Sequence, residues 1–180
     1  MKRLGLLLVA VAGGLGSLAW PALGSGAPAA AGELVGLDGR VLGTVEAARG
    51  PGGVLLAVSA SGLPPGLHGF HLHAVGDCTP PFASAGGHFN PTKRQHGLLH
   101  PEGPHLGDLP NVYVALDGVL RAEVFAPGVS MEASGDGGLA ALLDGDGAAV
   151  VLHEGPDDHR TDPAGAAGAR IACAVVRATP

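Results

Sequence analysis

Short apolar runs separated by turn-forming residues restrict the fold of this chain more than any other feature. Glycine supplies 32 of the 180 residues and proline 15, and many of them lie between the runs. The runs lack a 3.6-residue period, so they predict β-strands rather than helices. The expected strands are Val41–Val45, Val54–Ala60, Phe70–His73, Val112–Leu116, Leu120–Val124, Leu139–Leu143, Ala149–Leu152 and Ile171–Val176. Many short strands with frequent turns favour an all-β antiparallel sandwich or barrel.

Three longer segments interrupt this pattern: Ala74–Pro110, Ala126–Gly138 and Glu154–Arg170. Loops of this length in a compact domain are usually functional or disordered. Two of the three contain or border histidines. We therefore expect these loops to build a site on the strand framework.

Residues 1–31 have the composition of an export signal. Lys2 and Arg3 precede an apolar run, Leu4–Leu23, and small residues continue to Ala31. This order is typical of a secretory signal peptide, so the expected mature domain spans residues 32–180. Cleavage is expected after position 24 or around positions 29–31. An uncleaved membrane anchor is the alternative, because the run is nearly long enough to cross a bilayer.

Charge and cysteine content limit the classes of partner and compartment. Without Lys2 and Arg3, eight of the 10 basic residues remain against 16 acidic ones, a formal charge of −8. Such a domain is not built to hold nucleic acid or an anionic membrane surface. Cys78 and Cys173 both lie in the expected exported part, where an oxidising compartment favours a disulfide. Two thiolate metal ligands are the weaker alternative, because no CxxC spacing is present.

The histidines carry the remaining chemistry. His71 and His73 stand two apart in an apolar strand, so their side chains share one face. Five more metal-capable residues follow: His88, His96, His105, Asp108 and His153. Four histidines suit tetragonal Cu(II), whereas three histidines and one aspartate suit tetrahedral Zn(II). One shared histidine would let these seven residues serve two ions.

Several motifs, in their order along the chain, resemble one known family. They are Gly69-Phe70-His71-Leu72-His73, Gly76-Asp77-Cys78, Ala85-Gly86-Gly87-His88-Phe89-Asn90-Pro91, Gly107-Asp108-Leu109-Pro110, His153-Glu154 with Asp157-Asp158, and Gly168-Ala169-Arg170-Ile171-Ala172-Cys173. Together they resemble copper/zinc superoxide dismutases of the bacterial, exported type. The resemblance implies an immunoglobulin-like Greek-key β-barrel of about eight antiparallel strands with long metal-binding loops.

The resemblance also implies a role for each candidate residue. The implied copper ligands are His71, His73, His88 and His153. The implied zinc ligands are His88, His96, His105 and Asp108, so that His88 bridges the two ions. Cys78 and Cys173 would form the family's disulfide. Arg170 would guide and hold superoxide, and Asp157 would link copper- and zinc-ligand histidines.

The expected activity is the conversion of superoxide into dioxygen and hydrogen peroxide by copper cycling between +2 and +1. Zinc has no redox role, and His88 would carry a proton to the product. One alternative is a dismutase-like protein that stores or delivers copper and zinc without turnover. A copper-only dismutase is disfavoured, because the zinc set is present.

The expected location is the periplasm, the cell envelope or the extracellular space. Membrane contact is expected only if the N-terminal segment stays uncleaved. The sequence leaves a monomer and a homodimer equally open.

Overall fold

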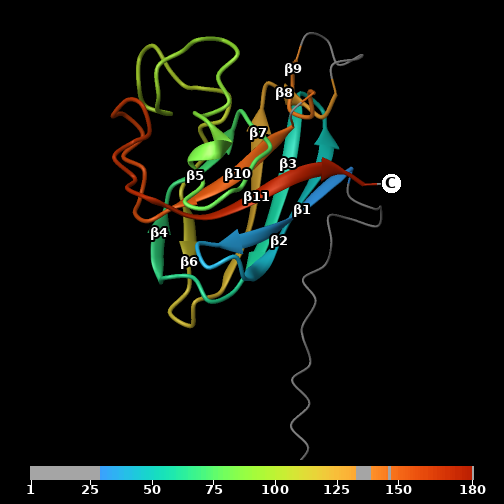
Figure 1. Ribbon diagram of the computed structural model, residues 1–180. Coiled ribbons are helices and arrows are strands. Elements are labelled where there is room, and N and C mark those ends of the chain that lie inside the picture. Colours follow the sequence, from blue (N-terminus) through green and yellow to red (C-terminus); the bar gives the residue numbers. More distant parts are fainter. Residues whose placement is uncertain (1–28, 133–138, 146, 180) are drawn as a thin grey trace, which may run out of the picture.

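The computed structural model describes residues 29–132, 139–145 and 147–179, and within them the chain is all-β (Figure 1). Nine strands form one sheet in the order β4-β6-β7-β3-β2-β1-β11-β10-β5, and β8 and β9 pair separately. The strands are β1 (Ala30–Gly36), β2 (Val41–Gly50), β3 (Gly53–Ala60), β4 (Gly66–His68), β5 (Phe70–His73), β6 (Val112–Val114), β7 (Leu120–Pro127), β8 (Val129–Ser130), β9 (Ala140–Ala141), β10 (Ala148–His153) and β11 (Arg170–Ala178). All pairs in the large sheet are antiparallel, whereas β8 and β9 are parallel.

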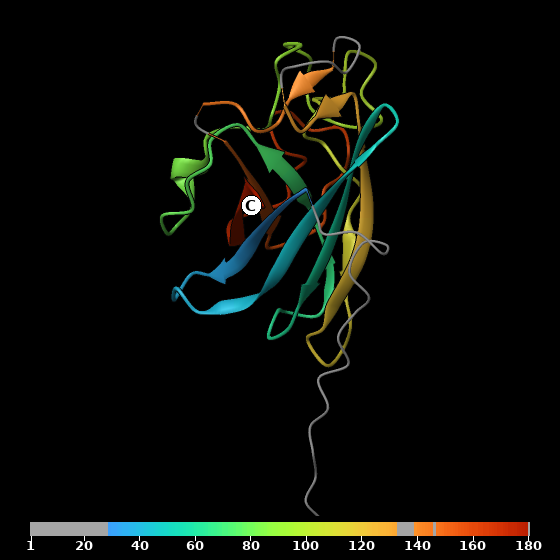
Figure 2. The same cartoon turned by 90° about the vertical axis from the view of Figure 1, so that its right-hand side faces the viewer.

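The large sheet curls until its two edges nearly meet. Its edge strands, β4 and β5, are separated in the chain by Gly69 alone. Gly69 N donates to Gly155 O at 2.8 Å, and Gly69 O accepts from His153 N at 2.9 Å. Neighbours far apart in sequence, such as β3 with β7 and β5 with β10, give the crossing pattern of a Greek key. The expected antiparallel barrel is confirmed, and Figure 2 shows its curvature.

Strand β10 has both faces covered. Val150 and Leu152 point into the main barrel core, and Ala149 and Val151 pack in a second, smaller cluster with Phe82. This outer cluster lies beneath the first long loop, which the Cys78–Cys173 disulfide joins to β11. The expected disulfide is therefore present, and the loop that it anchors covers β10, the strand that carries His153.

The strand expectations hold for the longest elements and are incomplete elsewhere. Strands β1, β4 and β8 were not expected, and the expected strand Leu139–Leu143 is reduced to β9. These pieces are short or rich in Ala and Gly, so they carry no alternating pattern, and pairing with neighbours decides their conformation. Among the described residues the only helical turn is η1 (Ala83–Ala85), and none of their helices is long and apolar enough to cross a membrane. Most of the expected signal segment lies outside the described residues.

Candidate metal centre

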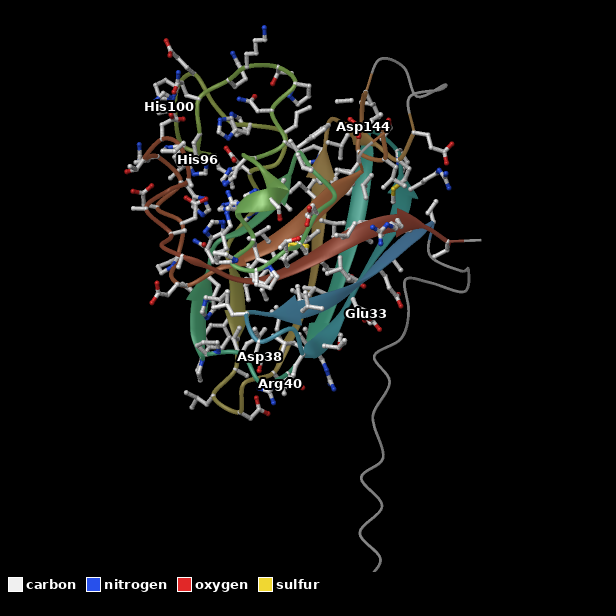
Figure 3. The ribbon with its side chains drawn as sticks, viewed as in Figure 1. Glu33, Asp38, Arg40, His96, His100 and Asp144 are labelled. Atoms are coloured by element: carbon white, nitrogen blue, oxygen red, sulfur yellow. A yellow bond between two sulfur atoms is a disulfide. The ribbon has the colours of Figure 1, made fainter. Side chains whose placement is uncertain are left out.

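Two paired strands and two loops carry the candidate ligands. Strand β5 holds His71 and His73, and its antiparallel partner β10 ends at His153. The first long loop returns to β5 through two isolated bridges, His73 with His88 and His71 with Asp108. These pairings bring residues more than 80 positions apart to one side of the barrel. Figure 3 shows His96 on that side, where this loop meets the one that follows β10, whereas Asp144 lies elsewhere.

A buried four-histidine set consists of His71, His73, His88 and His153. Their ligand atoms all lie within 4.8 Å of one another. One ring nitrogen of each is buried without a hydrogen-bond partner: His71 Nδ1, His73 Nε2, His88 Nε2 and His153 Nε2. Buried polar atoms are normally paired. Four convergent unpaired imidazole nitrogens therefore fit a metal ion that prefers nitrogen ligands.

The second ring nitrogen of each member has an acceptor that orients the ring. His71 Nε2 lies 2.7 Å from Asp157 Oδ2, and His88 Nδ1 lies 2.8 Å from Asp108 Oδ1. His73 Nδ1 lies 3.0 Å from Gly86 O, and His153 Nδ1 lies 3.2 Å from Gly168 O. An acceptor on one nitrogen fixes the tautomer and leaves the other nitrogen as the ligand atom.

The three-histidine–aspartate set consists of His88, His96, His105 and Asp108. All four residues are buried, and their ligand atoms lie within 4.8 Å of one another. The Nδ1 atoms of the three histidines lie 2.8, 3.0 and 3.1 Å from Asp108 Oδ1. Asp108 Oδ2 accepts from two backbone amides, Gly97 N at 2.8 Å and His105 N at 2.9 Å. The first long loop is thus wrapped around one carboxylate. Three nitrogens and one oxygen are a donor set that suits zinc.

His88 belongs to both sets through different atoms. Its Nδ1 faces Asp108, and its Nε2 is the unpaired nitrogen of the four-histidine set. One ring can therefore face two ions, as the sequence led us to expect.

Burial and hydrogen bonding shift the pKa values of the two sets differently. Burial lowers the pKa of His71 and of His153 to about 4 and that of His73 to about 2, so these rings are neutral and able to act as ligands at pH 7. For His96, burial also acts to lower the pKa, but hydrogen bonds to Asp108 and Asp157 outweigh it and raise the pKa to about 9.

The pKa of Asp108 is held far below its usual range. Burial acts to raise this pKa, but hydrogen bonds from His88, His96 and the Gly97 amide outweigh it. Asp108 is therefore an anion at pH 7, the state in which a carboxylate binds a cation.

Asp157 joins the two sets from outside. Its Oδ2 lies 2.7 Å from His71 Nε2, and its Oδ1 lies 3.1 Å from His96 Nε2. Burial acts to raise the pKa of Asp157, but these two hydrogen bonds and that from the His159 amide hold it well below its usual range. One buried carboxylate thus orients a ring in each set.

Arg170 lies beside a hollow of about 270 Å³ whose lining includes His88, His153 and Pro163. Its guanidinium donates to Phe82 O and, at 2.6 Å, to Gly86 O. Two carbonyls thus fix the cation at the mouth of the four-histidine set. A guanidinium has five N–H donors, so further donors are available to an anion in the hollow.

The other histidines lie outside both sets. His68 is buried between His153 O at 2.7 Å and Pro64 O at 2.8 Å, so it is a hydrogen-bonded core residue. His100 accepts from Glu102 N, and Figure 3 shows it farther out than His96.

Two residues that sequence reasoning missed contact Asp157. Asn111 hydrogen-bonds its backbone, and a Cβ on Gly165 would overlap its carboxylate. Neither belongs to a ligand-like spacing, so the sequence held no signal for them.

Comparison with known proteins agrees with this geometry. Residues 41–176 match the family model described as copper/zinc superoxide dismutase. Superoxide dismutase [Cu-Zn] 2 of Aquifex aeolicus is 48% identical over 147 residues, which cover 81% of this chain and 84% of the relative. Superoxide dismutase [Cu-Zn] of Caulobacter vibrioides is 49% identical over 142 residues, covering 78% and 80%. The superoxide dismutase-like protein YojM of Bacillus subtilis is 41% identical over 144 residues, covering 78% and 72%.

Two solved structures share the fold. A SOD-like protein from Bacillus subtilis aligns with a TM-score of 0.75 and 39% identity, covering 80% of this chain and 95% of that chain. Cu/Zn superoxide dismutase from Brucella abortus aligns with a TM-score of 0.64 and 31% identity, covering 82% and 98%.

Proposed function

Because this chain belongs to the copper/zinc superoxide dismutase family, we propose that it converts two superoxide anions and two protons into dioxygen and hydrogen peroxide. Copper would bind in the four-histidine set, and zinc in the three-histidine–aspartate set. The observation that carries this proposal is the convergence of four buried, unpaired imidazole nitrogens. Copper supplies the redox chemistry when bound, because it alternates between +2 and +1 and so accepts and returns one electron.

The residues of this chain supply binding, charge and protons. Arg170 lies at the hollow with its cation fixed by two carbonyls, so it would attract and orient a small anion there. His88 lines the same hollow, and its unpaired Nε2 would hold the proton that the peroxide receives. Asp157 and Asp108 keep the ligand rings in one tautomer.

Storage or delivery of copper and zinc without turnover is the second candidate function. The observation that favours it is that one relative is named only as a superoxide dismutase-like protein. Against it, all seven metal-capable residues and Arg170 are present in this chain.

The decisive experiment pairs metal analysis with a superoxide-consumption assay on one purified sample of the mature protein. The proposal expects about one copper and one zinc per chain and a rate of superoxide loss close to the diffusion limit. Arg170→Ala should lower this rate about tenfold with copper retained, because local charge steers the anion. Arg49→Ala is the matched control, since Arg49 is exposed and pairs with Glu132. Full copper occupancy without turnover would favour the storage function.

We also propose export with cleavage before Ala29. Ala29 N donates to Ala47 O at 2.9 Å and Ala29 O accepts from Thr179 N at 3.1 Å, while Ala30 is buried in β1. Cleavage at positions 29–31 would remove these bonds, whereas cleavage after Gly24 would leave β1 whole. The disulfide is consistent with an oxidising compartment. The mass of the mature protein recovered from the cell envelope gives its first residue and so tests the cleavage site. A mature chain that begins at or after residue 30 would contradict the proposal.

A further inference from the structure

We propose that Asn111 is a positioning residue that holds Asp157 in place and thereby orients one ligand ring in each metal set. Asn111 lies between Pro110 and the start of β6, and it belongs to neither set. The inference rests on the proposed ligand sets and concerns a side chain outside them.

Both arms of the Asn111 amide bind the backbone of one residue. Asn111 Oδ1 accepts from Asp157 N at 2.8 Å, and Asn111 Nδ2 donates to Asp157 O at 2.8 Å. Nδ2 also lies 3.2 Å from His159 Nε2. A two-armed clamp of this kind fixes the orientation of a residue as well as its position. The clamp joins segments 46 residues apart, so it is a tertiary contact and not a local turn.

The Asp157 carboxylate itself packs closely against the Gly165 backbone. Gly165 lies over its carboxylate with φ +64°, and any side chain there would overlap Asp157 Oδ1 and crowd His96 Nε2. Only 3% of Asp157 is exposed. Gly165 restricts the carboxylate and Asn111 holds the backbone of the same residue, so together they fix where the carboxylate lies.

That place determines which nitrogens of two ligand rings are free. Asp157 Oδ2 accepts from His71 Nε2 and Oδ1 accepts from His96 Nε2, at 2.7 and 3.1 Å. Each ring then presents its Nδ1, toward the four-histidine set from His71 and toward Asp108 from His96. Hydrogen bonds weaken steeply when distance and angle change. A shift of the Asp157 backbone would therefore affect both rings together.

The competing explanation is that Asn111 only stabilises the start of β6. The chain offers a comparison in Asn90, which makes the same pair of bonds to Arg94, at 2.8 and 3.0 Å, but within one loop and with no link to Asp157. Loss of a purely structural amide should lower the melting temperature without changing the two metal sets in parallel.

A double-mutant cycle separates the two explanations. Zinc affinity is measured by chelator competition, and the copper site by its visible absorption, in the wild type, Asn111→Ala, Asp157→Ala and the double variant. We expect Asn111→Ala to weaken zinc binding about tenfold, the lower end for groups that support ligands from outside, and to shift the copper absorption. Because Asn111 acts through Asp157, the double variant should bind zinc no more weakly than Asp157→Ala.

Two controls complete the test. Val58→Ala opens a core cavity on β3, and its loss of melting temperature should leave zinc affinity and copper absorption unchanged. Asp157→Asn replaces Asp157→Ala in the cycle if the alanine variant does not fold. Additive losses in the double variant, or an unchanged copper absorption in Asn111→Ala, would overturn the proposal. Both readouts are independent of superoxide, so a wild type without turnover would defeat the proposed activity and leave this result standing.

Discussion

The two metal sets are built in different ways, although they share His88. Three members of the four-histidine set stand on paired strands, His71 and His73 on β5 and His153 on β10. All members of the three-histidine–aspartate set come from one loop, residues 88–108, which closes around the Asp108 carboxylate.

The ligands of the two sets are therefore held in position by different parts of the fold. Strand pairing positions three of the four histidines through the barrel itself, so their geometry should persist as long as β5 and β10 remain paired. The loop-built set depends on a buried anion and on the anchoring of its loop. We therefore expect perturbations of the loop to weaken zinc binding more than copper binding.

Reduction of the Cys78–Cys173 disulfide should have the largest effect. The bond closes 95 residues, and loss of such a loop constraint costs roughly 4–5 kcal/mol in the chain-entropy model. Thermal unfolding of the metal-free protein with and without reductant measures this loss. Because Cys78 anchors the loop, zinc affinity should fall more than copper affinity. Equal losses of zinc and copper affinity would contradict the proposed difference between the two sets. Two reactive thiols in the native protein would refute the disulfide.

Asp108→Asn should be the next largest perturbation. A structural zinc site is worth about 10–16 kcal/mol, or about 2.5–4 kcal/mol for each of four ligands, and Asp108 also accepts from the Gly97 and His105 amides. We therefore expect zinc affinity to fall about 1000-fold. Copper affinity should fall less than tenfold, since no strand residue changes. Parallel titrations with each metal measure both constants, and a greater loss for copper would contradict the assignment.

His153→Ala is the reciprocal test. It removes one ligand from the four-histidine set, so copper affinity should fall about 100-fold. Zinc should stay bound, because His153 belongs to the four-histidine set alone. Metal content by mass spectrometry after dialysis gives the result. Equal loss of both ions would show that the two sets are not separable.

The free energy of unfolding of the metal-free protein should depend on pH in opposite directions for the two sets, with a change of about 1–2 kcal/mol on each side of neutrality. The pKa values of His71 and His153 are lowered to about 4, so the stability these rings contribute is present above pH 6.5 and lost as pH falls toward 4. The pKa of His96 is raised to about 9, so its contribution is present below pH 6.5 and lost as pH rises through 9.

Melting temperature against pH should accordingly peak near neutrality. His96→Gln should remove the decline on the alkaline side and keep the decline between pH 6.5 and 4, which comes from His71 and His153. An alkaline decline that persists in this variant would exclude His96 as its source.

Much of the framework was predictable from sequence. Strand β5 matches the expected Phe70–His73, and β3 and β10 differ from expectation by one or two residues, because buried apolar runs between turns have few other solutions. Strand β1 was not predictable, since Ala30 and its neighbours resemble the end of a signal segment until they pair with β2 and β11.

The sequence by itself determined the chemistry of this protein: which side chains can bind metals, that His71 and His73 share a face, and that two cysteines can pair. Those properties are local, set by residue type and by the period of a strand. Only the tertiary structure decided that His153 meets the other histidines, that Asp157 reaches a ring in each set, and that Asn111 holds Asp157. These contacts join segments 46 to 86 residues apart, and nothing in their spacing encodes them, because barrel closure sets which distant segments become neighbours.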